Sequence, residues 1–384
     1  MFFKQLVGIS LFFTCSYVRA GDTLVTAILK RIETLQNRED TYFTKGIFPC
    51  YRQYAFNKKR IRKDDNIFYA GLIGYIVNSH QICLSADEKI ISDTILSRIA
   101  GVAPKFRNRQ GRNTYNFWPT DTLKIFPNSG WINWFDKSYA LADDTDDTAI
   151  MLMVLNTNSD TVEQVHNLMQ EFINKKSHPV HNTLKEYKKF ETYSTWFGKK
   201  MVTEFDVCTI ANILTMVQTY NLPWNAADSA GLNLLQYMIE HKDHLQHPDK
   251  LSVYYKNTPI ILYHLSRLMY CKKISQLDVY KPQLIEEAKA AFNKSDNLVE
   301  RIMLKTALLH WGYNWKEQPL ILSENIITEV EKTHYPFFIA NLACTMPKGI
   351  AYPFVNAGIT KFYFHCPAFN LSLLLEYTLE TIGK

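Results

Sequence analysis

Apolar residues gather in six runs along the chain, each about as long as a buried helix. None of the runs alternates strictly between apolar and polar positions, which is the pattern of a half-buried strand. They predict buried helices over residues 67–77, 149–155, 207–217, 260–269, 302–313 and 368–379. More polar segments between them fit helices with one apolar face, at residues 161–174, 229–241, 283–292 and 324–332.

A short polar or aromatic segment, here called the head, directly precedes most of the buried runs. The runs recur along the chain at irregular intervals. Equivalent positions, separated by 47 to 82 residues, are Asp65, Asp147, Asp206, Thr258, Lys305 and Ala368. Such recurrence is typical of a repeat of one buried and one covering helix. We therefore expect an all-α fold, a single-domain (α/α)6 toroid over residues 21–384, with the N-termini of the inner helices at one end of the ring. An irregular all-α fold without a ring is the alternative.

The first twenty residues have the pattern of a secretory signal. Lys4 precedes a short apolar run, and the small residues Val18 and Ala20 fit a cleavage site. We therefore expect export to the periplasm or beyond, after cleavage near Ala20. The apolar run is shorter than the roughly 20 residues that cross a bilayer, and no later segment is long enough, so no stable membrane span is expected.

Composition and charge narrow the possible partners. The chain has 384 residues, 47% hydrophobic and 14% aromatic, which is too apolar for a disordered chain and enough for a large core. Its net charge of +6 is spread along the sequence, so no nucleic-acid partner is expected. The basic stretches at residues 58–63 and 107–112 fit solvated loops.

Six cysteines remain once the signal is removed, and their pairing is open. An exported chain with an even cysteine count can form disulfides. Cys208 and Cys271, however, lie in apolar runs, which fits buried thiols at least as well. No CxxC spacing occurs, so the sequence predicts no zinc site.

Residues 101–142 interrupt the helical pattern with a long, aromatic, turn-rich segment. A loop of this length inside a compact domain is usually functional or disordered, and its tryptophans, Trp118, Trp131 and Trp134, argue against disorder. We expect the segment to fold over the ends of the inner helices. It ends directly at the acidic stretch described next.

Four aspartates lie within five residues at 143–147, immediately before a buried helix. One or two would be explained as helix caps that also favour the helix dipole. Four exceed what capping requires, because neighbouring carboxylates repel one another. If the group is partly buried, at least one member keeps its proton at neutral pH. The pattern therefore predicts a site for acid catalysis.

The stretch Asp144-Thr145-Asp146-Asp147-Thr148-Ala149 resembles the DxDD(T)A motif of the class II terpene cyclases, such as squalene–hopene cyclase and the diterpene cyclases. Those enzymes are built from α/α toroids, and the middle aspartate of their motif protonates an alkene or epoxide. The resemblance covers about six residues sharply and residues 21–384 only in general architecture. It implies that Asp146 is the general acid, that Asp144 and Asp147 set its protonation, and that an isoprenoid is cyclised without a cofactor or metal.

Aromatic faces attract carbocations, and water must be kept from them. Residues expected to line such a site are Trp118, Trp131, Trp134, Trp196 and Phe197, together with Asp65, Asp206, Tyr254 and Tyr255 from neighbouring helix heads. Each of the aromatic residues could equally belong to an ordinary helical core.

Two features depart from the resembled family. Class II enzymes place their site between two toroids, whereas this chain has room for one, and secretion is unusual for an enzyme that acts on isoprenoid intermediates. Asp143, Asp144 and Asp147 also spell the DDxxD magnesium motif of class I terpene synthases, but we find no second metal motif.

Two other classes of function remain. An exported α/α toroid could act on carbohydrate. A glycoside hydrolase would need a second carboxylate across a cleft from Asp146 or Asp147, and candidates are Asp65, Glu204 and Asp206. A polysaccharide lyase would need a base, for which His264, His365, Tyr254 and Tyr255 are available. The remaining class is a toroid that binds a ligand without turnover.

Overall fold

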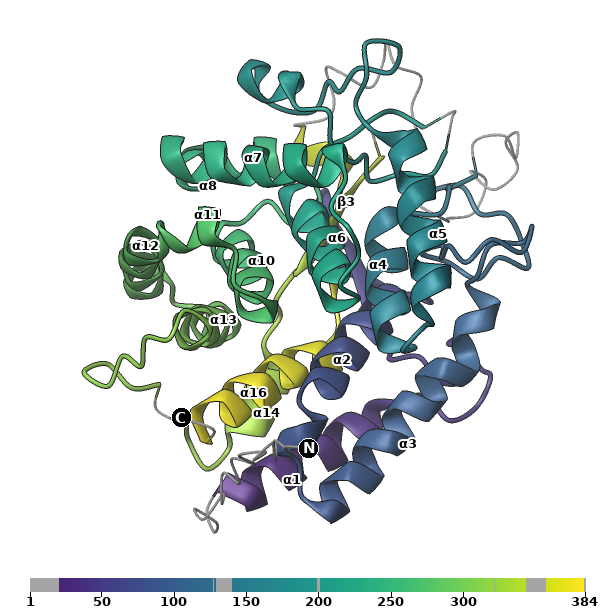
Figure 1. Cartoon of the computed structure of the whole chain (residues 1–384). Helices are drawn as coiled ribbons and strands as arrows, with labels where there is room; N and C mark the ends of the chain where they lie inside the picture. Colours follow the sequence, from purple (N-terminus) through teal and green to yellow (C-terminus); the bar gives the residue numbers. More distant parts are fainter. Residues whose placement is uncertain are drawn as a thin grey trace, which may run out of the picture.

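Six apolar helices pack side by side in a closed ring, which Figure 1 shows end on. Each helix contacts the next along the chain, and the last returns to the first. The computed structural model describes residues 21–126, 128, 140–198, 201–320, 322–342 and 357–382, without the side chains of residues 21–23 and 58. The ring helices are α2 (Phe68–Ser79), α4 (Thr145–Val154), α6 (Val207–Thr219), α10 (Thr258–Cys271), α13 (Leu298–His310) and α16 (Pro367–Ile382).

The ring forms because its helices are apolar almost all round. Every residue of α4 is buried, and α6 is buried along nearly its whole length, so each helix can pack against a neighbour on both sides. Polar side chains fix where these helices begin. The carboxylates of Asp144 and Asp206 and the amide oxygen of Asn297 accept hydrogen bonds from the first free backbone N–H groups of α4, α6 and α13.

Helices with a single apolar face cover the ring from outside. In α5, for example, Val162, Val165 and Met169 are buried one helical turn apart while the rest is largely polar. The covering helices are α1 (Gly21–Leu35), α3 (Ala86–Val102), α5 (Ser159–Met169), α7 (Ala226–His241), α12 (Lys281–Lys294) and α14 (Ile326–Lys332). Short helices are α8 (Asp243–Gln246), α9 (Pro248–Leu251) and α11 (Ser275–Asp278), with 3₁₀ turns η1 (Gln81–Cys83), η2 (Ala103–Lys105), η5 (Gln170–Phe172), η6 (Lys185–Lys189) and η8 (Gly358–Thr360).

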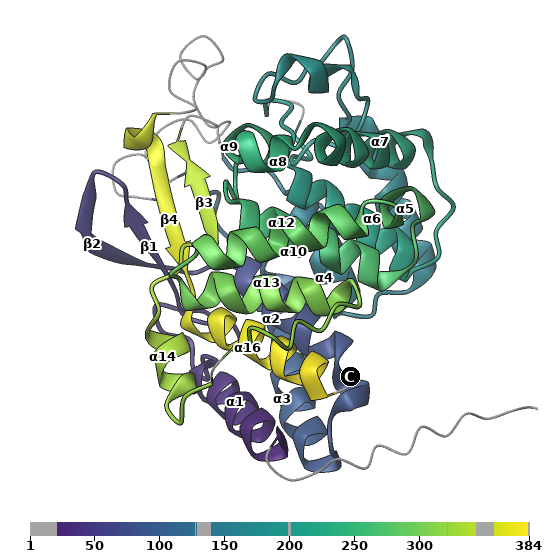
Figure 2. The same ribbon diagram turned by 90° about the vertical axis from the view of Figure 1, so that its left-hand side faces the viewer.

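A four-stranded antiparallel sheet lies at one end of the ring (Figure 2). The order of its strands is β2-β1-β4-β3, and Phe364 of β4 pairs with Arg52 of β1 on one side and Phe338 of β3 on the other. The N-terminal hairpin β1–β2 and the two C-terminal strands β3 and β4 are therefore joined in one sheet through the pairing of β1 with β4. Their bounds are β1 (Cys50–Tyr54), β2 (Asn57–Asp64), β3 (Phe338–Asn341) and β4 (Lys361–His365).

The predicted fold class is wrong. The chain is not an all-α (α/α)6 toroid, because it carries this sheet and because its described residues contain fifteen α-helices rather than twelve. The six buried runs and the four single-faced segments are all helices, as predicted, but α1 and α3 were not anticipated. Residues 58–63, read as a solvated loop, belong to the edge strand β2, whose basic side chains point largely to solvent.

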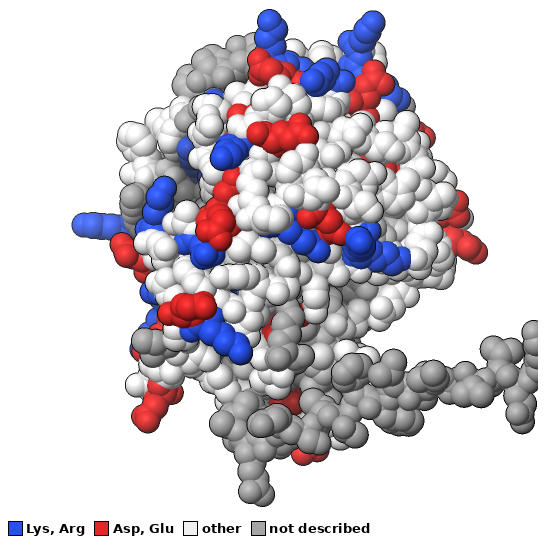
Figure 3. Space-filling view, turned by 60° about the vertical axis from the view of Figure 1, so that its left-hand side comes forward, with Lys and Arg blue, Asp and Glu red and all other residues white. Residues whose placement is uncertain are grey.

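The structure bears on three other features of the sequence: the N-terminal segment, the cysteines and the surface charge. The signal at residues 1–20 lies outside the described residues, and no described helix is both long and apolar enough to cross a membrane. All cysteines in the described ranges are unpaired thiols, namely Cys50, Cys83, Cys208, Cys271 and Cys366. On the face shown in Figure 3, acidic and basic side chains are interspersed, without a broad patch of one sign.

Candidate functional site

A narrow, mostly apolar pocket lies where the ring helices begin, beside strand β3. The N-terminal ends of α2, α4 and α6 meet there, and the 101–142 segment contributes Phe117, Phe126 and Leu141 to its wall. Its volume is about 50 Å³. Six aromatic rings line it, from Phe68, Phe117, Phe126, Trp196, Tyr254 and Phe338, and its polar lining comes from Asp144, Asp146, Asp147, Thr195, Thr209 and Asn341.

Asp146 is buried in the first turn of α4, and both of its carboxylate oxygens accept hydrogen bonds. Asn212 of α6 donates its amide N–H to Oδ1 over 2.7 Å, and Tyr255 donates its hydroxyl to Oδ2 over 2.5 Å. Burial raises the pKa of Asp146, whereas these donors, the Thr209 hydroxyl and the nearby Arg267 act to lower it. The predicted general acid is therefore in the pocket and firmly oriented.

Asp144 and Asp147 form a hydrogen-bonded pair beside it. The backbone N–H of Asp147 donates to Asp144 Oδ1 over 2.6 Å, as in a helix cap. Burial raises the pKa of Asp144 well above its usual range, and the charges of Asp147 and Asp146 raise it further. Burial likewise raises the pKa of Asp147 to about 8. The pair therefore holds at least one proton at neutral pH.

Asp143 belongs to a different environment from the other three aspartates. Its Oδ2 accepts hydrogen bonds from Asn108 and Thr114, each over 2.5 Å, and Arg112 lies 3.7 Å away. It does not line the pocket, and it instead ties the 101–142 segment to the start of α4. The DDxxD reading thus loses its first member. Across the described ranges, no group of three or more His, Cys, Asp or Glu side chains is placed to hold a metal ion.

Two of the predicted aromatic residues line the pocket, and both are held by one buried acid. Glu204 accepts a hydrogen bond from Trp196 Nε1 over 3.0 Å and another from the Tyr254 hydroxyl. Trp118 and Phe197 are buried but lie outside the lining: the indole of Trp118 donates to Asp64, and Phe197 packs against Phe172. Trp131 and Trp134 fall outside the described residues.

The remaining predicted residues act as supports. Asp206 caps α6 and also accepts hydrogen bonds from the Ser252 hydroxyl and the backbone N–H of Tyr254. Burial raises its pKa to about 7. Asp65 accepts hydrogen bonds from Thr44 and does not line the pocket. Tyr255 does not line the pocket, but its hydroxyl is bonded to Asp146 and its ring packs near Phe68 and Phe338 of the lining.

Sequence analysis missed four aromatic residues of the lining: Phe68, Phe117, Phe126 and Phe338. Phe117 precedes the chosen Trp118, and adjacent residues in extended chain point to opposite sides. Phe68 opens a ring helix, the position at which the pocket was expected, so it could have been found. Phe338 reaches the pocket only through the pairing of β3 with β4, for which no local signal exists.

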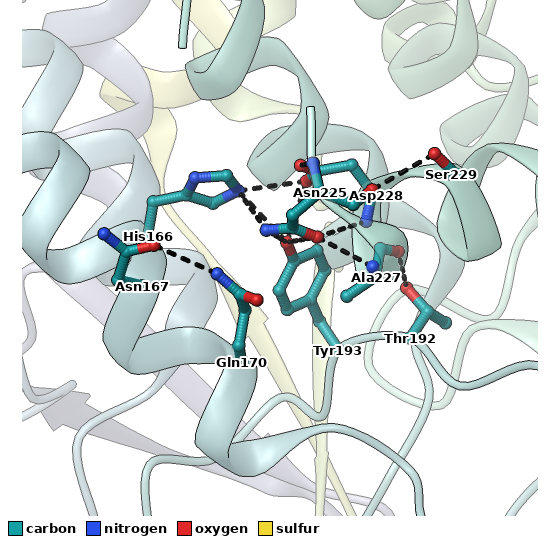
Figure 4. Close-up of polar contacts among 9 residues, drawn as sticks. All are labelled: His166, Asn167, Gln170, Thr192, Tyr193, Asn225, Ala227, Asp228 and Ser229. Carbon is teal, nitrogen blue, oxygen red and sulfur yellow. Dashed lines mark hydrogen bonds and ion pairs between the residues drawn. The ribbon is translucent and has the colours of Figure 1, made fainter. Parts of the chain in front are cut away.

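A second polar cluster lies in the outer layer, and it fixes the segment that carries Trp196. Figure 4 shows the side chains of His166 on α5, Tyr193, and Asn225 and Asp228 at the start of α7 pointing toward one another. The Tyr193 hydroxyl donates to Asp228 Oδ1 over 2.8 Å, and His166 Nε2 lies 3.1 Å from the same oxygen. None of the four residues lines the apolar pocket, so we interpret the cluster as structural.

The Tyr193→Phe variant tests that interpretation. Removing the hydroxyl leaves a buried carboxylate oxygen with one donor fewer, which is expected to lower the free energy of unfolding by about 1–3 kcal/mol. Urea denaturation followed by circular dichroism measures the loss. Tyr237→Phe is the matched control, because the Tyr237 ring packs on Tyr187 and no hydroxyl bond is recorded for it within the described ranges. Equal stabilities of the two variants would contradict the interpretation.

Comparison with known proteins adds no assignment. The chain matches no protein-family model, and it shows similarity neither to a curated protein nor to a solved structure. Function is therefore inferred from the geometry of the pocket.

Proposed function

We propose that the pocket is an active site for proton-initiated chemistry on an unsaturated isoprenoid, of the kind performed by the class II terpene cyclases. The observation that carries the proposal is the position of Asp144, Asp146 and Asp147, all buried at the head of α4 against an aromatic lining. Burial raises the pKa of each of them. A neutral carboxylic acid in apolar surroundings is suited to protonating a weak base such as an alkene.

The aromatic lining supports the second half of such a reaction. Protonation of an alkene leaves a carbocation, and the faces of Phe117, Trp196 and Tyr254 offer electron density to it. Apolar walls also exclude the water that would otherwise capture the cation. The resemblance assigns the acid to Asp146.

The lining favours this chemistry over glycoside hydrolysis. A hydrolase requires two carboxyl groups facing each other across the sugar, roughly 5–9.5 Å apart. Here the carboxyl groups of the described lining all come from the head of one helix. Two expected partners lie outside that lining: Glu204 is hydrogen-bonded to Trp196 and Tyr254, and Asp206 is hydrogen-bonded to Ser252.

Product analysis tests the proposal. The purified protein is incubated with linear isoprenoid hydrocarbons and isoprenoid diphosphates of increasing length, and products are identified by gas chromatography and mass spectrometry. We expect cyclic products from the natural chain and none from the variant in which Asp144, Asp146 and Asp147 are all replaced by Asn. Asp160→Asn, in the first turn of α5, is the control and should retain full turnover. Sugar release from polysaccharides, or unchanged turnover in the triple variant, would refute the proposal.

A further inference from the structure

The hydrogen bonds around Asp146 suit a carboxylate better than a carboxylic acid. Asn212 can only donate through the amide N–H that faces Oδ1, so that oxygen must accept. Tyr255 is placed to donate to Oδ2 and is itself fully buried. Two donors on one carboxyl group stabilise its ionised form. Proton release from Asp146 into the pocket would require the Tyr255 bond to break or reverse.

A buried cation further favours a negative charge on Asp146. Arg267 of α10 is 4% exposed, and its guanidinium lies 4.2 Å from the ring centre of Tyr75 and 5.6 Å from that of Tyr263. Within the described ranges its Nε and Nη2 atoms have no hydrogen-bond partner. Its positive charge lowers the pKa of Asp146. A buried cation is costly without a nearby anion; Glu376 is the carboxyl group whose charge acts on Arg267, and an ionised Asp146 would add to that stabilisation.

Asp147 has the opposite environment. Its side chain is 4% exposed and lines the apolar pocket, and its Oδ2 atom has no hydrogen-bond partner in the part of the chain that the structure describes. An ionised oxygen at that position would have neither solvent nor a donor to stabilise it, which is costly. A protonated, neutral carboxyl group at that position is far less costly.

We infer that Asp147, rather than Asp146, carries the transferable proton, and that Asp146 is the adjacent carboxylate that stabilises the developing positive charge. This inference rests on the proposed function for its chemical meaning, although the location of the proton can be measured without a substrate. Asp144 acts as a positioning residue, since it caps α4 through the backbone N–H of Asp147.

The step balances as follows. The O–H bond of Asp147 breaks while the π electrons of the alkene form a new C–H bond, which leaves the positive charge on the neighbouring carbon and a carboxylate on Asp147. After cyclisation the carboxylate of Asp147 takes a proton from the carbon next to the final cation. The electrons of that C–H bond form the alkene of the product, and the O–H bond of Asp147 is restored, so the substrate is isomerised without net gain or loss of atoms.

Two titratable groups act directly on the proton of Asp147: a side-chain hydrogen bond with Asp144 lowers its pKa, and the charge of Asp146 raises it. Three further groups, Asp206 at the head of α6 and Tyr255 and Arg267 on or before α10, interact with Asp146. Tyr254 lines the same pocket.

Infrared difference spectroscopy tests where the proton lies. Protonated carboxyl groups give a carbonyl band that carboxylates lack, and the spectrum of each variant at pH 7 is subtracted from that of the natural chain. We expect Asp147→Asn to remove one such band and Asp146→Asn to remove none. The opposite result would overturn the inference. Circular dichroism and thermal unfolding confirm that each variant is folded, and Asp40→Asn, an exposed substitution, is the control.

Once a substrate that the protein converts has been found, the turnover rate of each variant provides a second test. Loss of a general acid is expected to slow the reaction about 10²–10⁴-fold in Asp147→Asn, with a smaller loss in Asp146→Asn. If Asp146→Asn alone abolishes turnover, the inference fails while the proposed function stands. If the infrared bands follow the expectation but no isoprenoid reacts, the proposed function fails and the location of the proton stands.

Discussion

The folded protein should lose stability as the pH rises from about 4 to about 8, and Asp147→Asn should reduce that loss. Burial raises the pKa of Asp147 to about 8, against about 3.9 in an unfolded chain. The folded state therefore binds this proton more tightly than the unfolded state. Its stabilising contribution is complete below about pH 4 and disappears as the pH passes through the folded pKa, with a slope of about 1.4 kcal/mol per pH unit.

Urea denaturation at pH values from 4.5 to 8 measures this slope. The natural chain is expected to lose stability steadily across the range, with Asp144 and Asp206 adding to the effect because burial raises the pKa of Asp144 well above its usual range and that of Asp206 to about 7. Asp147→Asn should reduce the slope of the profile and be the more stable protein at pH 8. The control is Asp40→Asn, because hydrogen bonds from Lys45 and Lys105 lower the pKa of Asp40, which confines its contribution to more acidic pH. Parallel profiles for Asp147→Asn and the natural chain would show that Asp147 is ionised at neutral pH.

Arg52→Met should cost the protein about 3–5 kcal/mol of unfolding free energy, because it leaves a buried carboxylate without its cation. Arg52 on β1 and Asp64 on β2 are 4% and 2% exposed, and their charged groups lie 3.2 Å apart. Asp64 also accepts hydrogen bonds from Trp118 Nε1 and Asn66 over 3.0 Å each. The carboxylate of Asp64, held by Arg52, therefore connects the sheet through Trp118 to the segment that contributes Phe117 to the pocket.

Chemical denaturation of matched variants isolates the effect. Arg38→Met removes a surface ion pair with Glu33, in which the Arg38 side chain is 58% exposed, and it should cost no more than about 1 kcal/mol. Replacing both members of the buried pair, as Arg52→Met with Asp64→Leu, should restore much of the stability lost in the single variant. Equal free energies of unfolding for Arg52→Met and Arg38→Met would contradict the prediction that the buried ion pair contributes more to stability than the surface pair.

The helices of the ring could be predicted because each is encoded by a continuous run of mostly apolar residues. Residues 207–217 and 368–379 are apolar on every face, and a polar residue such as Asp206 marks where the first begins. The sheet left no such signal. Strand β2 has the sequence NKKRIRKD and lies at an exposed edge, so its composition matches that of a loop. Strand β4 is only five residues long and runs directly into α16, so its sequence cannot be told from the segment that leads into a helix.

The position of the acidic site could be predicted from the sequence, but the different environments of its four aspartates could not. The crowding of four aspartates before an apolar helix predicts raised pKa values, and three of the four do line one pocket. The partners that distinguish them come from elsewhere in the chain. Asn212 and Tyr255 hold Asp146 from 66 and 109 residues away, and Asn108 and Thr114 draw Asp143 out of the group. Such distant pairing depends on how the ring closes, which no local pattern encodes.

The order of strands and ring helices has a consequence for how the fold opens. Strand β4 lies between β1 and β3, and α16 fills the gap between α13 and α2. Detachment of residues 361–382 would therefore separate β1 from β3 and expose the apolar sides of α2 and α13 in the same event. We expect the sheet and the ring to open as one cooperative unit, with shared protection of their amides in hydrogen exchange.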